Sequence, residues 1–199
     1  MIENGTRFEG VRKQSMRASV YTIGHSTRSL EEFLDLLRES SVEQLADIRR
    51  YPGSRRFPHF SGDALNDSLP QAGIDYVHMA ELGGRRKSLP NSANAGWRNE
   101  QFRAYADHMA SDEFHQAVDH LLERGAHGSL AVMCAEAVPW RCHRNLLSDE
   151  LVRRGLNVVH IIGSQSVKLH ELNPMARDCG DHLEYPPEQR DLALGSTDV

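Results

Sequence analysis

Short runs of branched and aromatic residues alternate along the chain with longer segments in which apolar residues recur every three or four positions. The short runs predict five strands, at Val20–Ile23, Glu43–Ile48, Asp75–Met79, Leu130–Met133 and Val158–Ile162. The segments between them predict helices. This alternation favours an α/β fold: a three-layer sandwich with a mostly parallel central sheet of about five strands and helices on both faces.

The helical segments differ in how clearly the sequence marks them. The clearest is SLEEFLDLLRESS, where Ser29 and Glu32 form a capping box before an apolar stripe. A weaker helix is expected from Phe60 to Ala72, interrupted by Pro70. Two more are expected, one from Asn99 to about Arg124 with a break near Ser111 and one from Asn145 to Arg154.

Length and composition predict a single domain. A chain of 199 residues with 39% apolar and 26% charged residues is typical of one globular domain, and no apolar run is long enough to cross a membrane. We expect the α/β domain to span residues 19–179, with flexible tails at 1–18 and 180–199. Three cysteines without a secretion signal predict reduced thiols and a cytoplasmic protein.

Ionisable residues follow several of the predicted strands. His25 follows the first strand, Asp47 and Arg49 end the second, and Cys134 and Glu136 follow the fourth. His78 and Glu81 follow the third. Since ligands of parallel α/β sheets bind beyond the carboxyl ends of the strands, we expect all of these side chains to face one crevice. The alternative for each residue alone is a structural role, such as an Asp47–Arg49 ion pair.

The stretch MCAEAVPWRCHR concentrates reactive groups after a buried strand. Here Cys134 is a candidate nucleophile, and His143 or His25 a candidate for proton transfer. Glu136 is a candidate base or orienting group, and Asp47 joins the candidate catalytic set. A metal site formed by Cys134, Cys142, His143 and His25 is an open alternative, although the paired C-x-x-C spacing of zinc ribbons is missing.

Arginines near this crevice predict an anionic ligand. The net charge of −5 argues against a protein that coats nucleic acid, yet arginines cluster after the second strand. The candidate anion-binding residues are Arg49, Arg55, Arg56, Arg141 and Arg144. Guanidinium groups bind phosphate and carboxylate alike. We therefore expect a small, phosphate-bearing ligand. The alternative is a nucleic-acid-binding or repair-associated module that uses residues 49–60 and Arg85-Arg86-Lys87.

Several long motifs resemble one known family. YTIGHSTRSLEEFLDLL, LADIRRYPGSRRFPHF, GIDYVHMAELGGRR and LAVMCAEAVPWRCHRNLLSDEL with GLNVVHI are similar, in this order, to the family catalogued as domain of unknown function 488. The resemblance covers about residues 20–163 and implies a bacterial or archaeal protein without an established activity. Asp47-Ile48-Arg49 also resembles the Asp-Val-Arg of rhodanese domains. Six residues separate Cys134 from Arg141, however, where those families have five, and Glu136 in the loop would repel an anion.

Overall fold

A computed structural model describes residues 19–187 of the chain, and it contains a six-stranded sheet in the order β3-β2-β4-β1-β5-β6. The strands are β1 (Ser19–Gly24), β2 (Gln44–Asp47), β3 (Asp75–His78), β4 (Leu130–Cys134), β5 (Asn157–Gly163) and β6 (Ser166–Leu169). The first five run parallel, and β6 pairs antiparallel with β5. The predicted α/β class and the mostly parallel sheet are confirmed.

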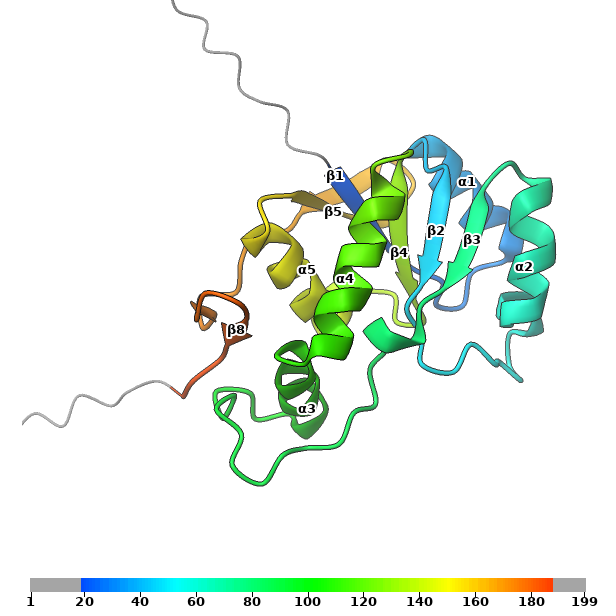
Figure 1. Cartoon of the computed structure of the whole chain (residues 1–199). Coiled ribbons are helices and arrows are strands. Elements are labelled where there is room, and N and C mark those ends of the chain that lie inside the picture. Colours follow the sequence, from blue (N-terminus) through cyan, green and yellow to red (C-terminus); the bar gives the residue numbers. More distant parts are fainter. Residues whose placement is uncertain (1–18, 188–199) are drawn as a thin grey trace, which may run out of the picture.

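Helices cover both faces of this sheet (Figure 1). On one face α1 (Leu30–Glu39) and α2 (Gly62–Gln71) pack through Phe33, Leu37 and Leu65 against Met133 of β4. On the other face lie α3 (Glu100–Met109), α4 (Asp112–Gly125) and α5 (Arg144–Arg153). Alternate residues of the strands therefore enter two separate cores, as expected for a buried parallel sheet.

The helix boundaries follow local sequence signals. Ser29 and Glu32 form the expected capping box at the start of α1. Ser111 caps α4 and separates it from α3, so the expected break in this segment is confirmed. The helix α5 ends before Gly155, whose φ of 88° is a left-handed conformation that suits glycine.

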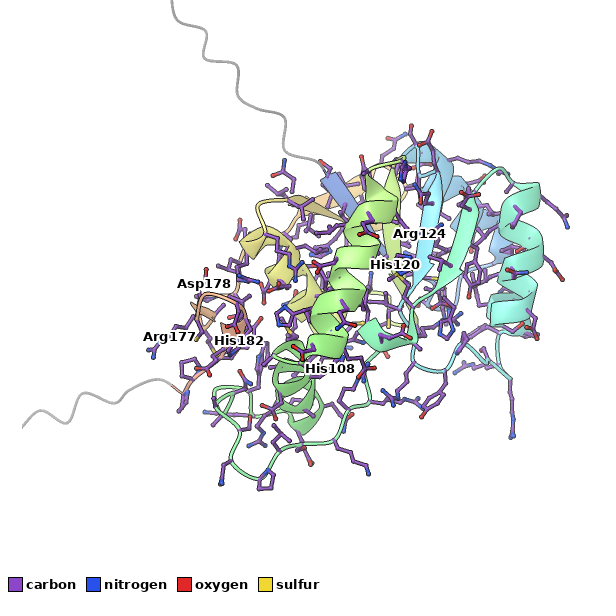
Figure 2. The ribbon with its side chains drawn as sticks, in the orientation of Figure 1. His108, His120, Arg124, Arg177, Asp178 and His182 are labelled. Carbon is purple, nitrogen blue, oxygen red and sulfur yellow. The ribbon has the colours of Figure 1, made fainter. Side chains whose placement is uncertain are left out.

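Two features were not expected from the sequence. One is the edge strand β6, and the other is the small antiparallel pair β7 (Arg177–Asp178) and β8 (Leu183–Glu184). Figure 2 labels Arg177 and Asp178 of β7, and His182 directly before β8. Tyr185, directly after β8, is fully buried and donates to Asp149 Oδ2 at 2.8 Å. The structure thus places residues 183–185 within the domain, while residues 1–18 and 188–199 of the expected tails lie outside the described residues.

The fold positions the ends of β1, β2 and β4 side by side. Gly24 of β1 is in register with Cys134 of β4, and Asp47 of β2 is in register with Met133. Because the strands are parallel, the loops that follow them emerge at the same edge. Within residues 19–187, no helix is both long and apolar enough to cross a membrane.

Candidate functional site

A cavity of about 1020 Å³ opens at the carboxyl edge of the sheet. Five of the candidates predicted from the sequence line this cavity: His25, Arg49, Cys134, Glu136 and His143. Ligands of parallel sheets bind beyond the carboxyl ends of the strands, and these residues lie together at that edge. The wall also includes three aromatic side chains and further arginines. These residues are Tyr51, Phe57, Phe102, Arg50, Arg56, Arg85 and Arg141.

The loop between β4 and α5 forms one wall of the cavity and is held tightly against β1. A Cβ atom placed on Gly24 would lie 1.7 Å from the carbonyl oxygen of Glu136, so only glycine permits this approach. The buried guanidinium of Arg144 donates to the same carbonyl at 2.6 Å and to Thr22 Oγ1 at 3.3 Å. The backbone geometry of the cavity wall therefore depends on a glycine and a buried arginine.

His25 and Asp47 hold the guanidinium of Arg49 from two sides. Asp47, with no exposed surface, accepts from Arg49 Nε at 2.8 Å and Nη2 at 2.5 Å, and from Tyr76 OH at 2.9 Å. His25 Nε2 lies 3.3 Å from Arg49 Nη1, and its Nδ1 lies 3.0 Å from the carbonyl oxygen of Ser26. Arg49 is thus fixed in direction, which is the arrangement that preorganised anion binding requires.

The environment of His25 keeps its ring neutral at neutral pH. Burial, followed by the charge of Arg49, lowers the pKa of His25 to about 4. The Nδ1–H then donates to the carbonyl of Ser26, and the lone pair of Nε2 accepts from Arg49. His25 therefore orients Arg49 and has no free ring nitrogen for proton transfer in this arrangement.

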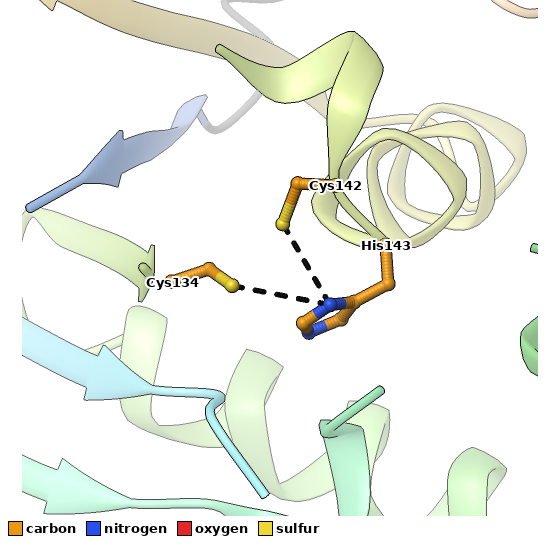
Figure 3. A group of neighbouring side chains, drawn as sticks. All are labelled: Cys134, Cys142 and His143. Carbon is orange, nitrogen blue, oxygen red and sulfur yellow. Dashed lines mark hydrogen bonds between the residues drawn. The ribbon is translucent and has the colours of Figure 1, made fainter. Parts of the chain in front are cut away.

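Cys134, Cys142 and His143 converge at the floor of the cavity (Figure 3). The two sulfur atoms lie 3.9 Å and 3.6 Å from the same ring nitrogen, Nδ1 of His143. The hydrogen bond with Cys142 and burial raise the pKa of Cys134. Burial raises the pKa of Cys142, but the Cys134 thiol and the charge of Arg144 outweigh it and lower this pKa to about 7. Cys142 is thus the more readily ionised thiol.

Arginines dominate the charge of the cavity. Among residues 19–187, five arginines line it, Arg49, Arg50, Arg56, Arg85 and Arg141, against one carboxylate, Glu136. Apart from Arg49, none of these arginines forms an ion pair with another described residue. Two lining residues, Ser26 and Arg85, have left-handed backbones with φ of 51° and 59°. Such conformations are uncommon outside glycine and occur often at binding sites.

Other residues expected at the site lie elsewhere. Asp47 is buried behind Arg49 and accepts four hydrogen bonds, and Arg144 is buried inside the cavity wall. Arg55 is exposed and does not line the cavity. His78 and Glu81 line a separate hollow of about 580 Å³ beside α4, so the expectation that every strand-end side chain shares one crevice was wrong for β3.

A buried hydrogen-bond chain behind the site was missed in the sequence. From Arg144 it runs through Thr22, His160 and His170 to Asp149, with steps of 3.3, 2.7, 3.0 and 2.8 Å. A carboxylate only accepts hydrogen bonds, so each group in the chain donates to the next when both histidines are neutral. The members come from four separate segments, and no local sequence signal connects them.

Comparison with known proteins identifies the family. Residues 29–151, more than half of the chain, match the family described as "Domain of unknown function DUF488". The chain belongs to this DUF488 family. Comparisons with curated proteins and with solved structures found no match, so the rhodanese likeness stays a prediction.

Proposed function

We propose that this DUF488 protein binds a small, phosphate-bearing molecule in the cavity at the carboxyl edge of its sheet. The observation that carries the proposal is the charge of the lining: in the described part of the chain it contains five arginines and one carboxylate, although the net charge of the protein is −5. Four of the five, Arg50, Arg56, Arg85 and Arg141, have no ion-pair partner among the described residues. A group of guanidiniums in a concave site attracts anions, and the fork geometry of arginine matches phosphate oxygens.

The shape of the cavity favours a ligand larger than phosphate itself. Its volume of about 1020 Å³ is that of a site for a metabolite of nucleotide size. Tyr51, Phe57 and Phe102 supply flat apolar surfaces beside the arginines. A ligand with one phosphate group and one ring would contact both kinds of surface.

Within the site, Arg49 is the best placed anion ligand, because His25 and Asp47 fix its direction. Its Nη1 is the donor least engaged by Asp47. Arg56 and Arg141 are exposed, so they would close on the ligand from the rim. Catalysis on the bound ligand would use Cys142, Cys134 or His143, which lie together on the cavity floor.

The alternative of a nucleic-acid-binding module has weaker support. Arg86, in the second basic group, donates to the carbonyls of Gly83, Ala80 and Glu81 and lies 3.4 Å from Glu113. The guanidinium of Arg86 is therefore engaged within the protein and is less available to bind a nucleic-acid phosphate. The neighbouring Arg85 lines the cavity instead.

The test is calorimetric titration with adenosine monophosphate, inorganic phosphate and a single-stranded oligonucleotide. We expect the mononucleotide to bind, and Arg56→Met and Arg141→Met each to weaken it roughly fivefold through loss of one charge-assisted contact. Arg55→Met is the matched control and should bind as the wild type does, because Arg55 lies outside the cavity. Equal losses in Arg55→Met and Arg56→Met, or binding of the oligonucleotide alone with a steep salt dependence, would contradict the proposal.

A further inference from the structure

The three side chains at the cavity floor form a set of metal-ligand type. Cys134 ends β4, Cys142 lies before α5, and His143 is the N-cap residue of α5. The two sulfurs and the imidazole nitrogen all lie within 4.8 Å of one another. Figure 3 shows both sulfur atoms directed at the same nitrogen.

The spacing of these atoms matches a tetrahedral metal. Sulfur at about 2.3 Å and nitrogen at about 2.0 Å from a tetrahedral zinc ion lie about 3.5 Å apart. Here Nδ1 of His143 lies 3.6 Å from Cys142 Sγ and 3.9 Å from Cys134 Sγ. The site would accept the ion with a small movement of one side chain.

The groups around the three residues are those that support metal ligands. Nε2 of His143 lies 3.3 Å from the carbonyl oxygen of Ile48, so Nε2 carries the proton and Nδ1 presents its lone pair to the sulfurs. The backbone N–H of Arg144 donates to Cys142 Sγ at 3.5 Å. A backbone carbonyl on the distal nitrogen of a histidine is the usual second contact of a metal-bound imidazole.

The arrangement leaves one coordination position open. All three residues line the cavity, and His25, the fourth ligand considered from the sequence, is engaged by Arg49 and Ser26 instead. Structural zinc sites have four protein ligands, whereas sites that act on a substrate have three and an exchangeable position. Two thiolates would neutralise a divalent ion and leave the surrounding arginines free for an anion.

We propose that Cys134, Cys142 and His143 bind one divalent cation of the zinc type, with its fourth position open to the cavity. The metal would present a water molecule or a ligand oxygen beside Arg49. This inference adds a second component to the same cavity and does not require the phosphate-bearing ligand to bind first.

A second group of potential ligands provides the control. Cys179, His182 and Glu184 also lie close together, in and around the β7–β8 pair. Cys179 is exposed, and His182 lies 2.6 Å from Asp181 and 3.6 Å from Glu184. This group lies apart from the cavity and lacks the carbonyl support found at His143.

The experiment uses the full chain, prepared without an affinity tag or chelator and then stripped and titrated with Co²⁺ and Zn²⁺ under reducing conditions. We expect one Zn²⁺ per chain by elemental analysis, and a Co²⁺ spectrum with the intense visible bands of tetrahedral, thiolate-bound cobalt. Cys134→Ser, Cys142→Ser and His143→Gln should each weaken Co²⁺ binding at least tenfold, while Cys179→Ser binds as the wild type does.

Two results would overturn the inference. One is that the reduced wild-type chain binds neither Co²⁺ nor Zn²⁺. This result would overturn the inference even if Cys134 and Cys142 readily form a disulfide on reoxidation, which would show only that the two thiols are close together. The other is that Cys134→Ser, Cys142→Ser and His143→Gln still bind the metal, while Cys179→Ser loses it. The wild-type cobalt spectrum decides the question even if a variant fails to fold. Calorimetry with the mononucleotide is a separate readout, so failure of anion binding and failure of metal binding are distinguished.

Discussion

The guanidinium of Arg144 donates to the carbonyl oxygen of Glu136 at 2.6 Å, across the loop that joins β4 to α5. The same guanidinium reaches Thr22 of β1. A buried positive charge on the first turn of α5 therefore joins the central strand to the cavity wall. The loop that carries Glu136, Arg141 and Cys142 is consequently a rigid part of the domain.

The first prediction concerns this arginine. Arg144→Met should lower the free energy of unfolding by about 3 kcal/mol, because the carbonyl of Glu136 and the buried hydroxyl of Thr22 lose a donor from a fully buried guanidinium. Arg141→Met, an exposed residue on the same loop, should change it by less than about 0.5 kcal/mol. Urea unfolding followed by fluorescence measures both. Equal effects would contradict the role assigned to Arg144.

The second prediction concerns Gly24. Gly24→Ala should destabilise the protein by at least about 2 kcal/mol, because its Cβ would overlap the carbonyl oxygen of Glu136. Gly163→Ala, at the end of β5, is the matched control, since a Cβ there meets nothing within 4 Å. Thermal unfolding of the two variants checks this. A stable Gly24→Ala protein would show that the loop is free to move away from β1.

The third prediction concerns the ion pair behind the cavity. Asp47→Asn should cost about 3 kcal/mol of stability, because it leaves the buried Arg49 charge without its carboxylate. Asp75→Asn, on the exposed surface of the neighbouring strand, should be close to neutral. Chemical denaturation measures the difference. An Asp47→Asn protein as stable as Asp75→Asn would mean that the pair is not buried as described.

The fourth prediction concerns pH. Burial, with the charges of His170, Arg144 and Lys168, lowers the pKa of His160 to about 3 from an ordinary value of 6.5. Between these values the unfolded chain binds more protons than the folded protein, so stability is highest above pH 6.5 and falls as the pH decreases. His160 alone should account for about 2 kcal/mol of loss between pH 7.5 and pH 5.

The measurement for this prediction is the urea midpoint across that pH range. His160→Gln should show a smaller decrease with acid than the wild type, whatever its stability at pH 7.5. His127→Gln, at an exposed position, should keep the wild-type decrease. If His160→Gln and the wild type lose stability in parallel, protonation of His160 is not the cause.

Much of the fold could be predicted because its signals are local. Five parallel strands, the capping box at Ser29 and the break at Ser111 all follow from short-range patterns. The edge strand β6 was missed because SVKL is short and exposed on both faces, so it lacks the apolar run of the inner strands. The β7–β8 pair has only two residues in each strand, too few for any periodicity.

The candidate site was predictable in position but less so in detail. Parallel strands with polar ends indicated the cavity edge, and His25, Arg49 and Cys134 lie there. The sequence does not reveal which way a loop side chain points. Arg56 lines the cavity, for example, whereas its neighbour Arg55 does not. The side chain of Arg144 is buried in the cavity wall, whereas that of the preceding His143 lines the cavity. The chain from Thr22 to Asp149 depends on contacts between distant segments.

The most direct test of an anion-binding cavity is a crystal structure with tungstate, a heavy analogue of phosphate that is located by its anomalous scattering. We expect one dominant peak inside the cavity, within hydrogen-bonding distance of Arg49 and bounded by Arg56 and Arg141. Tungstate bound only at surface arginines outside the cavity, at a concentration that saturates those sites, would contradict anion binding in the cavity.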